Sequence, residues 1–187
     1  CNLGYGGALE TGYLYGLEKN YDYVLQMDSD GQHLPDQLNI LLEPLTSGTA
    51  DLVIGSRYGG SESYDSGLSL RKLGHKVFSG ILFVISGFSL SDPTSGFQGL
   101  NRKALKLLAS GDFPADYPDS DVMLMVFLCG LRIKEIPVVM KERAGGKSMH
   151  SGLKPLYYGV KMLLSMLIVI LNLPKWRRWY KINASTE

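Results

Sequence analysis

The sequence predicts an α/β fold, with a mainly parallel sheet flanked by helices. Short apolar runs that suit buried strands alternate along the chain with longer segments whose apolar residues recur at helical spacing. Glycine and proline punctuate the ends of these runs, and no linker within the 187 residues is rich enough to separate two cores. Alternation of this kind is typical of layered folds in which helices cover a sheet.

In the first half of the chain, two predicted helices alternate with two predicted strands. Segment 6–20 follows a glycine-rich entry and is expected to be helical, and the apolar run 23–27 is expected to be a buried strand. Leucines at helical spacing predict a helix over 35–45, with Pro35 in its first turn. The run DLVIGS, residues 51–56, is the next predicted buried strand.

The second half continues the pattern after a loop rich in glycine and serine. We expect a helix over 71–85, a short strand or bulge at TSGFQGLN (94–101), a helix near 119–129 and a strand at RIKEIPVVM (132–140). The residues of the first of these helices that should face the core are Leu73, Val77, Phe78, Ile81, Leu82 and Ile85.

Two acidic residues, Asp28 and Asp30, follow the first predicted strand in the sequence QMDSDGQHLP. Because side chains alternate along a strand, we expect both carboxylates on the same side of its last residues, at the carboxyl edge where α/β sheets bind ligands. Carboxylates so close repel each other, which favours a cation between them, and Gln32 adds another oxygen ligand. This set suits Mg²⁺ or Mn²⁺, hard cations that also bind substrate phosphates.

Other interpretations of this turn are weaker. A calcium loop beginning at Asp28 would place His33 at its sixth position, where glycine is required. The two acids would also suit the capping of a turn and of the next helix, but one aspartate is enough for that, and Gln32 would have no role. Zinc is not expected, because neither His33 nor His150 has a second histidine at ligand spacing.

Charge and cysteine content narrow the function classes. The net charge of +1 gives no general attraction to polyanions, so no nucleic-acid partner is expected. Cys1 and Cys129 form neither a CxxC motif nor a disulfide framework, which favours a reducing compartment.

The C-terminal residues, 151–187, differ from the rest. We expect residues 153–173 to form a helix that exposes an apolar stripe, although its apolar part is shorter than the roughly 20 residues that cross a bilayer. The sequence PKWRRWYK follows and mixes cations with Trp176 and Trp179, which suits anchoring among lipid headgroups. The alternative is a helix docked on the core, followed by a solvated basic tail.

Five successive segments carry a resemblance to a known family. They are NLGYGGALETGY, QMDSDGQHLP, LVIGSRY, DPTSGFQGLNR and RIKEIPVVMKERAGGKSM, between residues 2 and 149. In this order they resemble the family 2 inverting glycosyltransferases with the Rossmann-like GT-A fold, in the dolichyl-phosphate mannosyltransferase-like branch. The resemblance implies transfer of a hexose, with inversion, from a GDP- or UDP-sugar to dolichyl or undecaprenyl phosphate, with Mg²⁺ or Mn²⁺.

The resemblance also implies how the chain is organised. Family members begin with a strand ending near Pro-x-x-Asn-Glu and a second strand ending in Asp-Asp-x-Ser, and neither motif occurs here. Residues 1–150 are therefore expected to be a partial catalytic domain that lacks the opening βαβ portion. Residues 151–187 would add a C-terminal amphipathic, membrane-surface helix and a basic, aromatic tail, peripheral at the cytoplasmic face of a membrane. A separate membrane-spanning protein is a possible partner.

By the resemblance, Asp28 helps to hold the nucleotide sugar, while Asp30 and Gln32 face the metal. Arg143 and Lys147, in RAGGKSM, are cations on a glycine-containing loop that would neutralise the leaving diphosphate and close over the donor. Without the resemblance, an ordinary basic surface loop would be the better interpretation of this segment.

Two arginines are associated, by the same resemblance, with the phosphate of the acceptor. Arg57 lies just beyond a predicted strand in GSRY, and Arg71 begins a predicted helix. The guanidinium fork of each suits phosphate oxygens. The family often has serine four residues after the second arginine, whereas this chain has His75, and Arg71 taken alone would more simply form a surface ion pair.

Asp92 and Asp119 are the two candidates for a catalytic general base. Asp119 precedes a predicted helix in YPDSD, where a carboxylate also suits a helix cap, and Asp92 in DPTSGF equally suits a turn. A phosphate monoester, with a second pKa of about 6, is largely ionised at neutral pH and needs no strong base. A sugar hydroxyl acceptor would need one.

Three rival functions stay open. In the first, the acceptor is a hydroxyl of a growing polysaccharide or glycan. The second is a nucleotidyltransferase, which also uses a metal-binding acid pair but needs a glycine-rich N-terminal phosphate loop that this sequence does not display. The third is a non-catalytic membrane-associated module.

Overall fold

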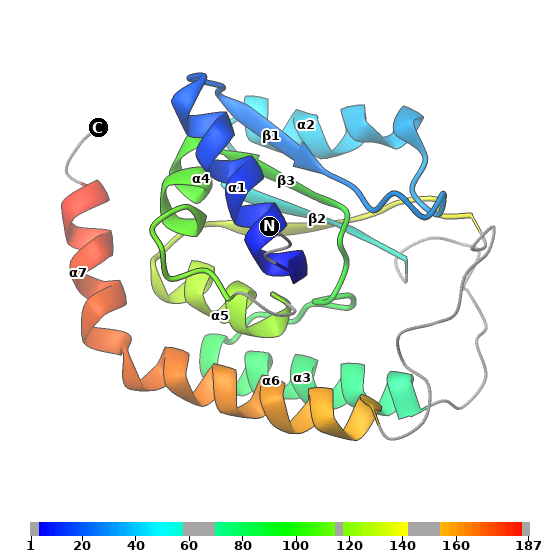
Figure 1. Ribbon diagram of the computed structural model, residues 1–187, viewed down its shortest axis with the longest axis vertical. Helices are drawn as coiled ribbons and strands as arrows, with labels where there is room; N and C mark the ends of the chain where they lie inside the picture. The colour runs from blue at the N-terminus through cyan, green and yellow to red at the C-terminus, as the bar shows by residue number, and fades with distance from the viewer. Residues whose placement is uncertain (1–3, 58–69, 115–117, 142–153, 185–187) are drawn as a thin grey trace.

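The chain forms a layered α/β fold, as its alternating pattern predicts (Figure 1). This computed structural model describes residues 4–57, 70–114, 118–141 and 154–184. At the start of two helices, residues 70–76 and 154–156, the backbone alone is described.

A four-stranded sheet lies at the centre, in the order β1-β3-β2-β4. Its strands are β1 (Tyr23–Gln26), β2 (Leu52–Ser56), β3 (Gln98–Asn101) and β4 (Ile133–Pro137). β2 and β4 pair in parallel, but β3 lies between β1 and β2 and runs antiparallel to both. The sheet is therefore mixed, and the prediction of a mainly parallel sheet is wrong for two of its three pairs. A short apolar run such as QGLN carries no information on strand direction.

The other three strands, β1, β2 and β4, point the same way, so their carboxyl ends share one edge of the sheet. This edge lies on the right in Figure 1. This edge consequently holds three segments of the chain: the turn after β1, the first residue after β2 and the segment after β4. The edge is where α/β sheets most often bind ligands.

One face of the sheet is covered by α2 (Leu38–Thr46), which a 3-10 turn at Pro35–Gln37 precedes. Its Leu41 and Leu45 pack with Val53 of β2 in a small core. The predicted helix 35–45 is thus confirmed, although its first turn is tighter than an α-helix.

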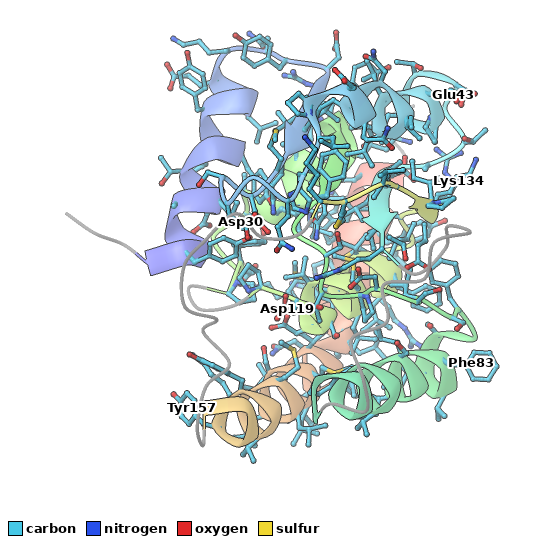
Figure 2. All side chains as sticks on the ribbon, turned by 90° about the vertical axis from the view of Figure 1, so that its right-hand side faces the viewer. Asp30, Glu43, Phe83, Asp119, Lys134 and Tyr157 are labelled. Carbon is cyan, nitrogen blue, oxygen red and sulfur yellow. The ribbon has the colours of Figure 1, made fainter. Side chains whose placement is uncertain are left out.

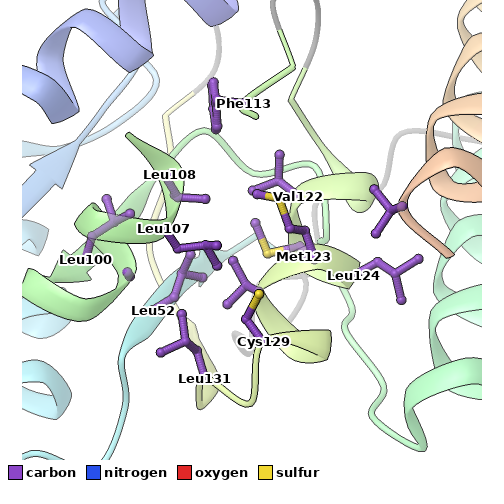
Figure 3. Packing of buried hydrophobic residues seen from close by; sticks show 14 of the residues in the cluster. Leu52, Leu100, Leu107, Leu108, Phe113, Val122, Met123, Leu124, Cys129 and Leu131 are labelled. Carbon is purple, nitrogen blue, oxygen red and sulfur yellow. The ribbon is translucent and has the colours of Figure 1, made fainter. Parts of the chain in front are cut away.

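The opposite face of the sheet carries the larger core. Three helices pack there, α1 (Gly4–Glu18), α4 (Arg102–Leu108) and α5 (Ser120–Leu128). Figure 3 shows Leu52 and Leu100 of the sheet meeting apolar side chains of α4 and α5. α4 was not expected from the sequence, because it begins directly at the end of β3 with no intervening loop.

A third layer is formed by α3 (Leu70–Ser86) and α6 (Lys154–Leu171), which lie side by side beyond α5 (Figures 1 and 2). α5 is consequently enclosed between the sheet and this layer, and seven of its nine residues are buried. Only one side of α3 reaches α5. For this reason Val77 and Ile85, predicted to face the core, are exposed.

The chain bends by 60° after α6 and continues as α7 (Leu173–Ala184), which packs against α5. The bend turns Trp176 into the core, where it is 5% exposed and its Nε1–H donates to the carbonyl oxygen of Val169 at 2.8 Å. The prediction that Trp176 anchors among lipid headgroups is therefore wrong. Trp179 is also partly buried against the core.

Candidate active site

A turn directly after β1 holds the acid pair. β1 ends at Gln26, so Asp28 and Asp30 lie in the turn and not, as expected, on the last residues of the strand. His33 fixes this turn, because its Nδ1 accepts the backbone N–H of Asp28 at 2.9 Å and its ring stacks on Phe97 at 4.8 Å. Burial lowers the pKa of His33, which keeps the imidazole neutral and able to accept this hydrogen bond.

The Asp28 carboxylate is held between α1 and the segment before β3. The Tyr5 hydroxyl donates to Asp28 Oδ1 at 3.4 Å. On the other side, a Cβ atom at Gly96 would lie 2.7 Å from both carboxylate oxygens, so this position has room for glycine alone. Burial, followed by the charges of Asp28 and Asp119, raises the pKa of Tyr5. Tyr5 and Gly96 were not predicted as site residues.

Asp30 and Gln32 connect this turn to the chain that follows β4. Asp30 Oδ1 accepts the backbone N–H of Gln32 at 3.1 Å. The carbonyl oxygen of Gln32 accepts the backbone N–H of Lys141 at 2.9 Å, and its side-chain Nε2 donates to the Lys141 carbonyl oxygen at 3.4 Å. Arg143 and Lys147 follow Lys141 in sequence but lie outside the described residues.

Arg57 and Asp92 form an ion pair at the site. Arg57 Nε donates to Asp92 Oδ2 at 2.8 Å, and a second guanidinium nitrogen reaches Oδ1 at 3.4 Å. Asp92 is fully buried, whereas the Arg57 side chain is 15% exposed. Glu135 of β4 holds the loop in turn, because its carboxylate accepts the backbone N–H groups of Ser91 and Asp92 at 2.8 and 2.6 Å. Asp92 therefore orients a partly accessible arginine.

Asp119 occupies the N-cap position of α5, yet its carboxylate makes no capping hydrogen bond. Asp121 serves there instead, since its Oδ1 accepts the backbone N–H of Asp119 at 3.0 Å. The pKa of Asp119 is raised to about 8, first by burial and then by the charges of Asp121, Asp92 and Asp28. Arg57 acts in the opposite direction.

Several predicted site residues thus lie near one another at the carboxyl edge of the sheet. Arg57 is paired with Asp92, and the charges of Asp28, Asp92 and Arg57 all act on the pKa of Asp119. Figure 2 views this edge, and Asp30 and Asp119 are labelled on it. The backbone of Arg71 lies in the first turn of α3, but its side chain is outside the described part of the structure.

Comparison with known sequences decides the family. Residues 1–108 match the family model described as glycosyl transferase family 2. The chain belongs to glycosyl transferase family 2. This family 2 chain is 35% identical over 156 residues to the undecaprenyl-phosphate mannosyltransferase of Micrococcus luteus, across 80% of the chain and 61% of the relative.

Two further relatives of this family 2 chain bear related names. It is 30% identical over 151 residues to the polyprenol monophosphomannose synthase of Mycolicibacterium smegmatis, across 80% of the chain and 57% of the relative. It is 28% identical over 167 residues to the UDP-N-acetylglucosamine–dolichyl-phosphate N-acetylglucosaminyltransferase of Methanococcus voltae, across 87% and 66%. The chain spans about three fifths of the length of these relatives.

Glycosyl transferase family 2 enzymes usually need a divalent metal. Among the residues that the structure describes, no three His, Cys, Asp or Glu side chains are grouped as a metal site. Mg²⁺ and Mn²⁺ do not require such a group, because one or two carboxylates together with substrate phosphates are enough. Asp30 and Gln32 offer oxygen atoms on one turn, so their chemistry fits a hard cation.

Proposed function

We propose that this chain carries much of the active site of an enzyme that transfers a hexose, with inversion, from a GDP- or UDP-sugar to a polyprenyl phosphate, dolichyl or undecaprenyl. The observation that supports it best is that Asp28 and Arg57 follow β1 and β2 at the carboxyl edge of the sheet, and that their charges, with that of Asp92, act on the pKa of Asp119. The Arg57 guanidinium, which can bind phosphate, thereby lies near the Asp119 carboxyl group, whose pKa is raised. The names of the relatives, which include polyprenyl and dolichyl phosphate carriers and one UDP-sugar, support a nucleotide-sugar donor and a lipid phosphate acceptor.

The donor would lie against the turn after β1. Asp28 would contact the nucleotide sugar, because His33 and Gly96 fix its position from two sides. Asp30 and Gln32 would hold Mg²⁺ or Mn²⁺, which neutralises charge on the leaving diphosphate. Arg143 and Lys147 are proposed to add positive charge to the same diphosphate as it departs.

The acceptor phosphate would bind Arg57, which Asp92 holds in place, with Arg71 as the second proposed contact. An oxygen of this phosphate attacks the anomeric carbon on the face opposite the diphosphate. The new carbon–oxygen bond forms as the bond to the diphosphate breaks, and the configuration inverts. At this pKa Asp119 is largely protonated at neutral pH; in its ionised fraction it would accept the remaining proton of a monoanionic acceptor, because a pKa of about 8 exceeds the second phosphate pKa of about 6. Asp92, already paired with Arg57, would act by positioning.

A hydroxyl acceptor on a glycan is the second candidate, and one observation favours it. A carboxylate whose pKa is raised to about 8 is a stronger base than an ordinary aspartate, and a hydroxyl nucleophile needs such a base. Asp119 would then contribute more to kcat than it does with a phosphate acceptor. The size of the decrease in kcat in Asp119→Asn accordingly distinguishes the two acceptors.

Transfer assays test this function directly. The purified protein with MnCl₂ is offered radiolabelled GDP-mannose or a UDP-sugar, with either undecaprenyl phosphate or a glycan primer as acceptor. We expect product in the organic phase with the lipid phosphate, and a KM for undecaprenyl phosphate that rises in Arg57→Ala more than the KM for the donor. Product on the glycan primer alone would establish the second candidate, and no product with any pair would favour a non-catalytic module.

A membrane-facing surface is proposed for the third layer of the fold. α6 and α3 expose large apolar side chains, with Leu171 71% and Val84 83% exposed, and Figure 2 shows Phe83 and Tyr157 at this layer. Within the described residues no single helix could cross a bilayer, and α6 with α7 meets the length and composition criteria only as a bent pair. We propose peripheral attachment at the cytoplasmic face of a membrane. A separate membrane-spanning protein remains a proposed partner there.

Vesicle flotation tests the attachment. The protein should float with phosphatidylcholine–phosphatidylglycerol vesicles, and added salt should weaken binding if the exposed Arg177 and Arg178 contribute. The double variant Leu164→Gln, Leu167→Gln should reduce flotation. Leu14→Gln, on the exposed side of α1, is the matched control. Equal flotation of the double variant and the control would contradict the proposed surface.

A further inference from the structure

The first turn of α5 is organised by one buried carboxylate. Asp121 is 1% exposed, and its Oδ1 accepts the backbone N–H groups of Asp119 at 3.0 Å and of Val122 at 2.9 Å. These bonds satisfy donors that the start of a helix leaves unpaired. Asp121 thereby takes over the capping role and fixes the backbone of Asp119, whose carboxylate is left for the site.

The other oxygen of the same carboxylate is contacted from α6. The hydroxyl of Ser165 donates to Asp121 Oδ2. Ser165 lies among the core-facing residues of α6, between the buried Met162 and Met166, while Leu164 on the outward side is 56% exposed. This hydrogen bond consequently joins the helix with the exposed apolar side to the turn that holds Asp119.

Packing beside this hydrogen bond is incomplete. A cavity of about 280 Å³ lies between α5, α6 and the start of α7, and both Asp121 and Ser165 line it. The ion pair of Asp112 with Lys175 borders the same cavity. Unfilled space beside the hydrogen bond would let α6 shift slightly relative to α5, because interiors resist displacement where atoms fill the space.

We propose that Asp121 is the positioning residue of Asp119, and that the Ser165 hydroxyl makes this positioning depend on how α6 is seated at the membrane surface. The proposal rests on the proposed function for the role of Asp119. Contact of α6 with the membrane would hold the Ser165 hydroxyl against the Asp121 carboxylate, and this hydrogen bond would stabilise the first turn of α5. A protein removed from the bilayer would keep its donor site but hold Asp119 less firmly.

An isosteric pair of variants tests the catalytic consequence. Ser165→Thr keeps the hydroxyl and Ser165→Val removes it at the same side-chain size, and the adjacent cavity accommodates either. With GDP-mannose and undecaprenyl phosphate in phosphatidylcholine–phosphatidylglycerol vesicles, we expect Ser165→Val to lose about tenfold in kcat, with the donor KM unchanged. Ser165→Thr should stay near the wild type. Asp112→Asn removes another carboxylate of the same cavity and is the control.

Amide hydrogen exchange gives a measurement that does not require activity. Adding the same vesicles should slow exchange at residues 119–122 about fivefold in the wild type and in Ser165→Thr, but not in Ser165→Val. If the wild type transfers no sugar, the proposed function fails while this exchange result still decides the coupling. Equal kcat for Ser165→Val and Ser165→Thr, or equal exchange with and without vesicles in the wild type, would overturn the proposal.

Discussion

Replacing Asp119 by asparagine should stabilise the protein while it removes the proposed base. The pKa of Asp119 is raised from 3.8 to about 8, chiefly by burial. Between these two values the folded protein keeps a proton that the unfolded chain has already released. The free energy of unfolding of the wild type therefore falls as the pH rises through this interval, and asparagine, which cannot ionise, abolishes this dependence.

The size of the effect follows from the two pKa values. A difference of this magnitude corresponds to at most about 6 kcal/mol once the pH exceeds the folded-state pKa. Part of the Asp119 side chain remains in contact with water, so we expect a smaller gain of about 2–3 kcal/mol in Asp119→Asn. The gain should grow between about pH 5 and pH 9 and vanish near pH 4.

Urea unfolding followed by circular dichroism measures this dependence. The wild type, Asp119→Asn and the control Asp112→Asn are compared at about five pH values from pH 4 to pH 9. Asp112 is ion-paired with Lys175 at a partly exposed position, so its variant should keep the wild-type pH dependence. A pH dependence in Asp119→Asn as steep as in the wild type would show that Asp119 is not held protonated, and the argument for its role would fail.

Three further substitutions address the surroundings of Asp28 and Arg57. Gly96→Ala places a methyl group 2.7 Å from the Asp28 carboxylate oxygens, so steady-state kinetics should show a donor KM raised about tenfold, and an unchanged KM would contradict the contact. Asp92→Asn weakens the pairing that orients Arg57 and should raise the KM for undecaprenyl phosphate more than the donor KM; equal changes would argue against that role. His33→Phe keeps an aromatic ring against Phe97 but leaves the Asp28 N–H without its acceptor, so urea unfolding should show a loss of about 1–2 kcal/mol. An unaltered unfolding midpoint in that variant would show that His33 does not stabilise the turn.

Much of the candidate site could be predicted because it follows local sequence signals. The strand at Tyr23–Gln26 and Gly31 with a positive φ of 79° place the acid pair in a turn at the carboxyl edge, as the apolar run and the glycine indicate. The position of Arg57 could be predicted in the same way, because this residue directly follows the apolar run that forms β2. Its pairing with Asp92, 35 residues later, depends on tertiary structure, and nothing in either segment announces it.

The roles of Asp119 and Asp121 illustrate what sequence patterns leave open. Both aspartates suit the start of a helix, and only the structure shows that Asp121 accepts the backbone N–H groups there while Asp119, with φ −131° and ψ −119°, makes no capping hydrogen bond. The apolar tail raises a similar ambiguity, because α6 is apolar on most of its circumference. Only the bend at Asn172 decides that Trp176 faces the core.

The reversed strand β3 has a consequence for synthesis of the chain on the ribosome. Among the described residues β1 pairs only with β3, so Tyr23 remains without this partner until Asn101 has left the exit tunnel. Pairing over so long a stretch of sequence is slow and costs loop-closure entropy. The nascent turn around Asp28 would therefore wait, solvated and unformed, while the residues between β1 and β3 are translated. This turn, which holds the proposed donor contact, would thus acquire its native geometry later than its place in the sequence suggests.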